Sequence, residues 1–410
     1  NVTIAVTGDV LLGSQVTPVL AGVNSPFEGV KNVLGSVDVL LINFENAATT
    51  SESAVKGDYP LKVDPSYVPK VKINNNTVAA LANNHVFDYG KTGMKDTLAT
   101  LKANNITSLG AGMNYDEAHK PVTIEKNGHK ITILNYMDSA NFAEYSQDVI
   151  PVANGSNPGY SAYDSALAKK QIKEARDNGS DFVLVFFHYG NEYHTSPNDV
   201  QVNYSHEVID YGADVVLGSH PHVSQGIEMY KNKPIFYSLG DFVFYPLGDS
   251  NTYSAYFVKF SLSGEKCTAT VYPVTISNDF PVYMDAGSGS SFLNSLSPLT
   301  KSLKVNQDGT GTLTFNLTQT TNSTEKDFKF NFLISGTNSY KSERFKCGLF
   351  NKSYALIPDV STSKPLFCKN EFMELLTPKI LFCKICITVL ISSFFFKNFW
   401  YLLGEISPNL

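Results

Sequence analysis

Residues 215–222 read VVLGSHPH, an apolar run that ends in two histidines, His220 and His222. The arrangement recurs elsewhere: residues 2–9 read VTIAVTGD and residues 182–188 read FVLVFFH, so an apolar run again ends at a side chain able to bind a metal. Short continuous apolar runs are typical of strands buried on both faces of a sheet. Because the carboxyl ends of parallel strands meet at one edge, where ligands bind, this stretch predicts a parallel sheet with a site at its edge.

Short apolar runs alternate with helical patterns over the first two thirds of the chain, which indicates a layered α/β fold. The expected strands are 2–7, 37–42, 77–81, 108–110, 131–136, 182–187, 215–217 and 234–238. The expected helices are 93–104, 164–178 and 200–211, the second with Asp164 as its N-cap and Gly179 just beyond its end. Residues 253–260 and 268–274 alternate in polarity and predict an added antiparallel pair.

Composition restricts the class of protein. The chain has 410 residues, 43 % hydrophobic and 17 % charged, enough for a large apolar core plus an appendage. Its net charge is −6 and it has no long basic run, so nucleic acid is excluded as an expected partner. We expect one large α/β domain over 1–280, and a polar Ser/Thr/Asn-rich extension over 281–340 with little regular structure apart from a short strand at 312–317.

The last expected segment is a Cys/Phe-rich tail over 341–410, with a candidate apolar helix at 380–403. Lys384 and Lys397 interrupt this stretch, which leaves 385–396 uncharged and short for a membrane span. A membrane anchor whose lysines snorkel, a buried helix and a read-through artefact all remain open. Cys383 and Cys386 form a CxxC without a second pair, which is a weak zinc signal.

Metal-binding side chains follow five of the apolar runs. In chain order they are Asp9, Glu45, Asn84, His188, His220 and His222. Carboxylate, amide and imidazole groups together suit divalent ions such as Mn, Fe, Zn or Mg, and a carboxylate such as Glu45 can bridge two of them. Taken alone, Asp9 can cap a turn and Asn84 tolerates turn geometry. Their shared position at strand ends favours a site for one or two divalent metal ions.

Longer stretches carry a resemblance to a known family. They read GDVLLG from Gly8, NFENAATT from Asn43, LANNHVFDYG from Leu81, FFHYGNEY from Phe186 and GSHPHVSQGIEMYKNKPIFYSLGDFVF from Gly218. Their order along the chain resembles that of calcineurin-like metallophosphatases. Their residues resemble those of the bacterial CapA, or poly-gamma-glutamate capsule biosynthesis, family over about residues 1–280. The resemblance implies a metallophosphatase-like layered α/β/β/α sandwich with a mostly irregular C-terminal extension.

The resemblance also implies roles for residues. It gives ligand roles to the six side chains above, and it makes His85 the acid, or the group that stabilises the transition state, beside the metals. It also lets Glu192 and Glu228 line the substrate cleft, with a structural cap or pair as the alternative for Glu228. Other metallophosphatases carry a His two residues after the first Asp, where this chain has Leu11. The first metal position therefore has fewer ligands. Asp241 stands where this family often has Asn, and we assign it no role.

Two functions follow from this resemblance. One is a metal-dependent hydrolase or transferase at the cell surface, acting on an anionic surface polymer or a phosphoester. The other is a non-catalytic accessory subunit that works with membrane synthase or export subunits. We expect the protein on the extracellular face of the membrane or secreted. The sequence starts at Asn1 and enters its first apolar run at once, which is consistent with a removed export signal.

Overall fold

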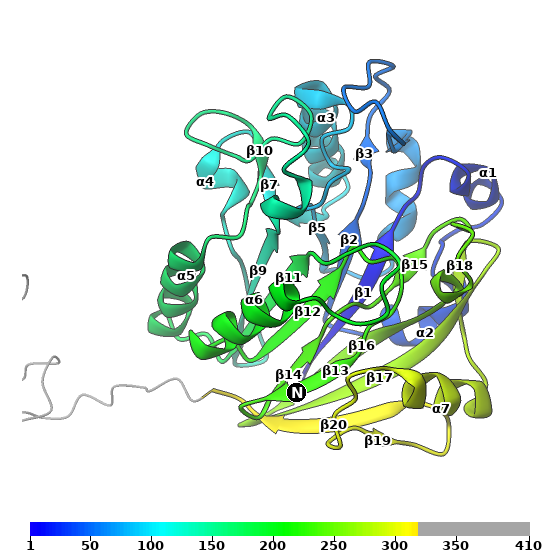
Figure 1. The fold of residues 1–410 in the computed structure, drawn as a ribbon, viewed down its shortest axis with the longest axis vertical. Helices are drawn as coiled ribbons and strands as arrows, with labels where there is room; N and C mark the ends of the chain where they lie inside the picture. The colour runs from blue at the N-terminus through cyan, green and yellow to red at the C-terminus, as the bar shows by residue number, and fades with distance from the viewer. Residues whose placement is uncertain (319–410) are drawn as a thin grey trace, which may run out of the picture. The chain divides into compact units, whose positions relative to one another are not determined.

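Two facing β-sheets form the centre of the fold in the computed structural model, which describes residues 1–318 (Figure 1). The first sheet has the strand order β19-β20-β17-β16-β1-β2-β5-β6. Its strands are β1 (Val2–Val10), β2 (Val39–Phe44), β5 (Thr77–Ala80), β6 (Thr107–Leu109), β16 (Ser254–Ser263), β17 (Lys266–Ser277), β19 (Lys304–Val305) and β20 (Gly311–Asn316), with β15 (Asp241–Val243) beside β1 and β18 (Phe280–Tyr283) beside β17. β1, β2, β5, β6 and β15 run parallel, and the other pairs are antiparallel.

The second sheet has the order β13-β14-β12-β11-β9-β8. Its strands are β8 (Val122–Lys126), β9 (His129–Met137), β11 (Phe182–His188), β12 (Val215–Ser219), β13 (Ile227–Tyr230) and β14 (Lys233–Phe236). β9, β11, β12 and β14 are parallel, and both edge strands are antiparallel. Two short pairs complete the strands: β3 (Ala47–Ala48) with β4 (Lys62–Val63), and β7 (Ala111–Gly112) with β10 (Gly159–Tyr160).

Helices cover the outer face of each sheet (Figure 1). They are α1 (Val16–Ala21), α2 (Lys31–Leu34) and α3 (Gly90–Ala103) on the first sheet, α5 (Ser165–Asp177) and α6 (Asp199–Asp210) on the second, and the short α4 (Tyr115–Ala118) and α7 (Ala286–Ser295). Alternation along the strands feeds separate cores: in β2, Val39 and Leu41 join the core between the sheets, whereas Leu40 and Ile42 join the core under the helices. The expected layered α/β/β/α sandwich is therefore confirmed.

The structure also bears out the helix signals in the sequence. Asp164 caps α5, because its Oδ1 accepts from the Leu167 amide at 2.7 Å, and Gly179 follows the helix at φ +83°. α6 starts after Asn198, which forms a capping box with Gln201. The alternating segments at 253–260 and 268–274 pair as β16 and β17.

The polar segment after residue 280 differs from our expectation of little regular structure. It contains α7, β19 and β20, and β20 extends the first sheet by pairing with β17. Leu313 and Phe315 of β20 are buried while Thr314 and Asn316 are exposed, so a Thr-rich sequence supplies a good half-buried strand. The Cys/Phe-rich tail, the candidate helix at 380–403 and the CxxC lie outside the described residues. Within residues 1–318, no helix has the length and apolar character that a membrane crossing requires.

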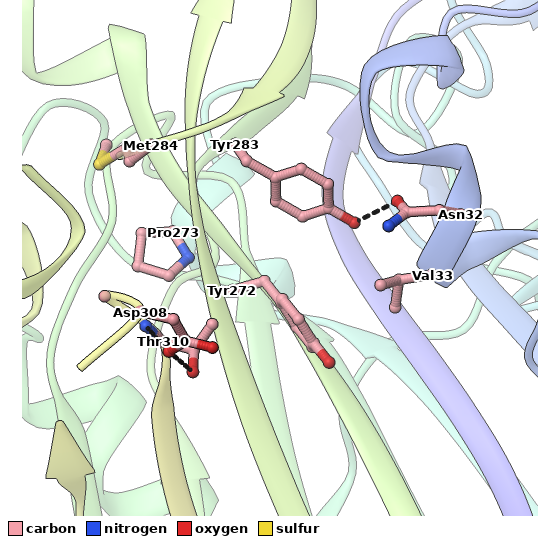
Figure 2. Close-up of a pocket in the computed structure, with 9 residues that line it drawn as sticks. Asn32, Val33, Tyr272, Pro273, Tyr283, Met284, Asp308 and Thr310 are labelled. Carbon is pink, nitrogen blue, oxygen red and sulfur yellow. Dashed lines mark hydrogen bonds between the residues drawn. The ribbon is translucent and has the colours of Figure 1, made fainter. Parts of the chain in front are cut away.

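The end of β18 is tied to α2 beside a cavity of about 180 Å³ (Figure 2). The Tyr283 hydroxyl donates to Oδ1 of Asn32 at 2.8 Å, and Tyr272 and Thr310 line the same cavity. None of the six expected metal ligands lines it.

One buried carboxylate joins several elements of the second sheet. Asp214 is fully buried and accepts from the Val183 amide at 2.9 Å, from Nζ of Lys233 at 2.7 Å and from the Thr318 amide at 2.7 Å, and it also pairs with the Arg176 guanidinium. It thus links α5, β11, β14 and the residues after β20.

We expect Asp214→Asn to lower the free energy of unfolding by about 2–4 kcal/mol, because it leaves two partly buried cations, Arg176 and Lys233, without their fully buried counter-charge. Urea unfolding followed by circular dichroism measures this. The matched control is Asp210→Asn, whose carboxylate pairs with Lys231 at an exposed position and should contribute less than about 1 kcal/mol. Equal midpoints for the two variants would show that Asp214 does not hold these elements together.

Candidate metal centre

The strand register brings the expected ligands to one edge of the sandwich. In the first sheet Asp9 of β1 lies beside Asn43 of β2 and beside Asp241 of β15. In the second sheet His188 at the end of β11 lies beside Ser219 at the end of β12, and His220 follows directly. Ends of parallel strands from both sheets thus deliver side chains to one place.

Two glycines allow this close approach. A Cβ on Gly8 would lie 1.9 Å from the carbonyl oxygen of Gly240, and a Cβ on Gly218 would lie 2.1 Å from that of Tyr237. Both distances are far inside van der Waals contact. Only a residue without a side chain lets the neighbouring backbone come this near to the strands that carry Asp9 and His220.

Two groups of three buried side chains have the spacing of metal ligands. The first is Glu45, His188 and His220, and the second is Asp9, His222 and Asp241; within each group the ligand atoms all lie within 4.8 Å of one another. Asn84 adjoins the first group, since its Oδ1 is 2.7 Å from Nε2 of His188. The structure therefore gathers all six expected ligands and adds Asp241, which the sequence analysis left without a role.

Several of these ligand atoms lack any partner. Oδ2 of Asp9, Oε1 of Glu45, Oδ2 of Asp241 and Nδ1 of His220 are buried and accept or donate no hydrogen bond. Buried polar atoms are almost always paired, and an unpaired one costs about 1–3 kcal/mol or more for a charged group. A divalent cation held by either group would satisfy carboxylate and imidazole atoms at once, so the residues present fit such an ion.

A chain of amides orients Asp9. Asn43 donates from Nδ2 to Oδ1 of Asp9 at 2.7 Å, and Asn83 donates to Oδ1 of Asn43 at 3.2 Å. The other oxygen of Asp9, Oδ2, accepts no hydrogen bond and remains available to a metal ion held with His222 and Asp241. Ser219 supports His188 in the same way, with Oγ at 3.1 Å from Nδ1. Supporting partners of this kind hold ligands in place and raise metal affinity. The visible signal for Asn43 and Asn83 was their position directly after two strands.

Burial sets the protonation of the cluster. It raises the pKa of Asp9, of Glu45 and of Asp241, the last to about 7. Burial, together with neighbouring histidine charge, lowers the pKa of His188 and His220 well below the usual range, so both are neutral, the form that binds metals.

His222 behaves in the opposite way. Burial alone would lower its pKa, but Asp241, Glu45 and Asp9 outweigh that and raise it to about 10. Its Nδ1 lies 2.8 Å from Oδ1 of Asp241 and 3.6 Å from Oδ2 of Asp9. Without a metal ion, the proton on His222 therefore supplies part of the positive charge that the carboxylates need.

Asp241 adds a carboxylate beside Asp9, whereas Leu11 supplies no ligand atom. Leu11 is buried in the core under the helices, and its amide donates to the carbonyl of Val243 at 2.8 Å. That bond holds β15 beside β1, and Asp241 lies next to Asp9 in the pairing. The available signal was a repeated dipeptide: Gly240-Asp241 follows a strand just as Gly8-Asp9 lies at the end of one.

His85 lies beside the ligands without belonging to either group. Its Nδ1 lies 2.7 Å from Oδ2 of Asp88, which also accepts from the Leu61 amide at 2.6 Å. Burial lowers the pKa of His85, and Asp88 partly opposes that shift. Because Asp88 holds Nδ1, the other ring nitrogen, Nε2, is left for a substrate. Asp88 is a second residue that the sequence analysis did not single out.

The backbone is strained at this edge. His220 has φ 98°, His222 has φ 61° and Tyr193 has φ 63°, all in the left-handed region that favours glycine. Such residues cost about 1–3 kcal/mol each and cluster at functional sites. Phe142 lies 5.1 Å from the His220 ring and Phe244 lies 4.9 Å from the His222 ring, which covers the imidazoles with aromatic surface.

The two expected cleft glutamates have different places. Glu192 is exposed on the loop after β11, next to Tyr193, whose ring stacks on His222 at 6.1 Å. It therefore lies at the rim. Glu228 of β13 accepts at Oε1 from His206 of α6 at 3.0 Å and bonds the Tyr237 hydroxyl with its other oxygen. Both of its oxygens are taken up by this structural pairing, the alternative left open for it, and the structure does not bring it to the ligands.

Comparisons with known proteins place the chain in a family. The family model described as "Bacterial capsule synthesis protein PGA_cap" matches residues 3–246. The chain is similar to the PGA biosynthesis protein CapA of Bacillus subtilis (strain 168), 36 % identical over 244 residues, which are 58 % of this chain and 62 % of that protein. It is also similar to the capsule biosynthesis protein CapA of Bacillus anthracis, 32 % identical over 253 residues, 60 % of each chain.

A solved structure of a putative 5'-nucleotidase from Staphylococcus aureus overlaps 70 % of this chain and 55 % of its own, with 14 % identity and a TM-score of 0.45. The chain spans about 60 % of the length of the two curated relatives. The matched residues 3–246 are more than half of the 410 and include every ligand from Asp9 to Asp241. On this ground the chain belongs to the bacterial PGA_cap capsule synthesis family.

Proposed function

We propose that this protein is a metal-dependent hydrolase or transferase that acts at the cell surface on an anionic polymer or a phosphoester. The observation that carries the proposal is the set of buried ligand atoms without hydrogen-bond partners, distributed over two adjacent three-residue groups. The names of the two Bacillus relatives link those proteins to poly-glutamate and capsule biosynthesis, which supports an anionic polymer as the substrate class.

Two divalent ions fit the ligands. Glu45, His188 and His220, with Asn84, would hold one, and Asp9, His222 and Asp241 would hold the other. Mixed imidazole and oxygen ligands suit Mn, Fe or Zn, and the carboxylates also suit Mg. When bound, such ions polarise a phosphoryl or carbonyl oxygen and lower the pKa of water.

The residues of the chain supply proton transfer and shielding. Protonated His85 is a good acid, because burial lowers its pKa, and Asp88 keeps the ring oriented at 2.7 Å. His85 can therefore give its Nε2 proton to a leaving oxygen. Phe142 packs over both His188 and His220 and keeps bulk water from that face of the ligands.

An accessory subunit for polymer synthesis or export, working with membrane synthase or export subunits, is the second candidate. The observation that favours it is Leu11, which supplies no ligand where other metallophosphatases have a histidine. Asp241 offsets that loss by offering a carboxylate beside Asp9. The accessory role predicts bound metal without turnover, so the two candidates can be separated.

The metal content of the purified protein after loading with Mn²⁺ tests the ligand assignment. We expect two ions per chain by elemental analysis, one of which is lost in His188→Ala and the other in Asp241→Ala. Each variant should lose more Mn²⁺ affinity than the roughly 10–100-fold lost when a residue that only supports a ligand is removed. His206→Ala is the matched control, because this histidine pairs with Glu228 away from the ligands. Unchanged stoichiometry in both ligand variants would refute the assignment.

Metal affinity should also depend on pH. The raised pKa values of Glu45, Asp241 and His222 mean that the metal-free cluster holds protons near neutrality, and a metal must displace them. Mn²⁺ should therefore bind more tightly as the pH rises from 6 to 8, by about tenfold per pH unit for each proton released. Calorimetry in two buffers of different ionisation enthalpy counts the protons. A flat profile with no proton release would contradict this protonation state.

Activity tests the role of His85. With Mn²⁺ bound, we expect His85→Ala to lower turnover of a chromogenic phosphodiester by about 10²–10⁴-fold, the usual contribution of a general acid, while both ions remain. Again His206→Ala should match the parent. Background turnover in a fully metal-loaded parent would instead favour the accessory role.

A further inference from the structure

A buried lysine lies beside His85 on the loop between β3 and β4. The side chain of Lys56 is only 5 % exposed. Its loop is pinned to the site, because the amides of Val55 and Lys56 donate to the carbonyl oxygen of Asp88 at 2.8 Å and 3.4 Å. The position of this lysine is therefore tied to the same residue that orients His85.

The ammonium group of Lys56 lacks good acceptors. Nζ lies 3.5 Å from the carbonyl oxygen of Asn84, 3.4 Å from Nδ1 of His85 and 3.9 Å from Oδ1 of Asp88. Nδ1 of His85 already serves the bond to Asp88, and 3.9 Å is too long for a hydrogen bond. Three N–H donors thus share one long hydrogen bond and one long ion pair with Asp88, while the ring of Tyr145 lies 5.6 Å away. Lysine is rarely this buried without a close partner.

The location of this ammonium group links it to the ligand groups. It contacts the backbone of Asn84, whose side chain adjoins His188, and it contacts His85 itself. Its charge also helps to lower the pKa of His188 and of His220, after the larger effects of burial and of neighbouring histidines. Lys56 is therefore within electrostatic reach of the first ligand group.

We infer that Lys56 binds an oxyanion of the substrate, a carboxylate or a phosphoryl group, next to His85. The unmet donors carry this inference, because an ammonium group forms its strongest hydrogen bonds with carboxylate and phosphate oxygens. The inference rests on the proposed function: it adds that the reacting bond is flanked by a negatively charged group, which Lys56 holds while His85 acts on the leaving oxygen.

Binding of two small probes to the full-length, Mn²⁺-loaded protein tests the inference. Inorganic phosphate and γ-glutamylglutamate are titrated by calorimetry into the parent, Lys56→Met and Lys56→Arg. We expect Lys56→Met to weaken binding by about tenfold or more, the size of one charge-assisted hydrogen bond, and Lys56→Arg to restore part of it. An effect on phosphate alone identifies a phosphoryl group, and an effect on the dipeptide alone identifies a carboxylate.

Lys62→Met is the matched control. Lys62 is on neighbouring β4, where its ammonium bonds Glu52 at 2.7 Å and the Ser51 carbonyl at 2.8 Å, so its donors are satisfied. This variant should bind both probes as the parent does. Unchanged affinity for both probes in a folded Lys56→Met protein overturns the inference, and so does an equal loss in Lys62→Met.

Two further measurements keep the test decisive. If Lys56→Met melts below the parent, Lys56→Gln replaces it in the binding experiment. In addition, mass spectrometry measures how fast Lys56 of the parent is acetylated with and without phosphate. If phosphate does not protect Lys56 from acetylation, the inference is overturned. The Mn²⁺ content is measured in the same samples. Bound metal with probe affinity independent of Lys56 defeats only this inference, whereas absent metal with Lys56-dependent phosphate binding defeats only the proposed function.

Discussion

Three carboxylates, Asp9, Glu45 and Asp241, are buried side by side: burial raises the pKa of all three, Asp9 and Asp241 raise that of Glu45 further, and Asp9 raises that of Asp241. Like charges in a low-dielectric interior repel strongly, so this arrangement is stable only when a cation or protons neutralise it. The proton on His222 supplies some of that charge, and a divalent ion would supply more of it. The rest of the site follows from this constraint, because neutral imidazoles and orienting amides are arranged around the charge that must be compensated.

Large apolar layers around the cluster offset the free energy that its buried charges cost. Strands such as β2 and β11 are buried on both faces, and alternate residues feed separate cores on each side of each sheet. Hydrophobic burial of this extent contributes far more free energy than a few strained or unpaired groups remove. His220 and His222 can therefore keep their left-handed backbone conformation at the sheet edge, where it directs their rings toward the candidate ligand groups.

Charge around the cluster is graded. The buried carboxylates form its centre, His85 with Asp88 lies to one side, and Lys56 adds a positive group on that same side. Asp88 connects these parts, since its side chain holds His85 and its backbone holds the loop of Lys56. A substitution at Asp88 would thus disturb both neighbours at once, which makes Lys56 and His85 the cleaner positions for testing the proposed anion binding and proton transfer separately.

The sequence by itself determined the layered fold and the positions of most of the candidate ligands, because both depend on local patterns. A buried parallel strand is a short apolar run, and the residue that follows it lies at the ligand-binding edge, so the position of Asp9 or His188 could be read from its neighbours in the chain. The tertiary structure decided Asp241, Asp88, Lys56 and the structural place of Glu228. Each depends on contacts between segments far apart or on loop geometry: β15 must pair with β1 before Asp241 meets Asp9, and the β3–β4 loop must fold over Asp88 before Lys56 meets His85. The strand register and the burial of these side chains are set by the packing of the whole domain. They cannot be read from any single stretch of the sequence.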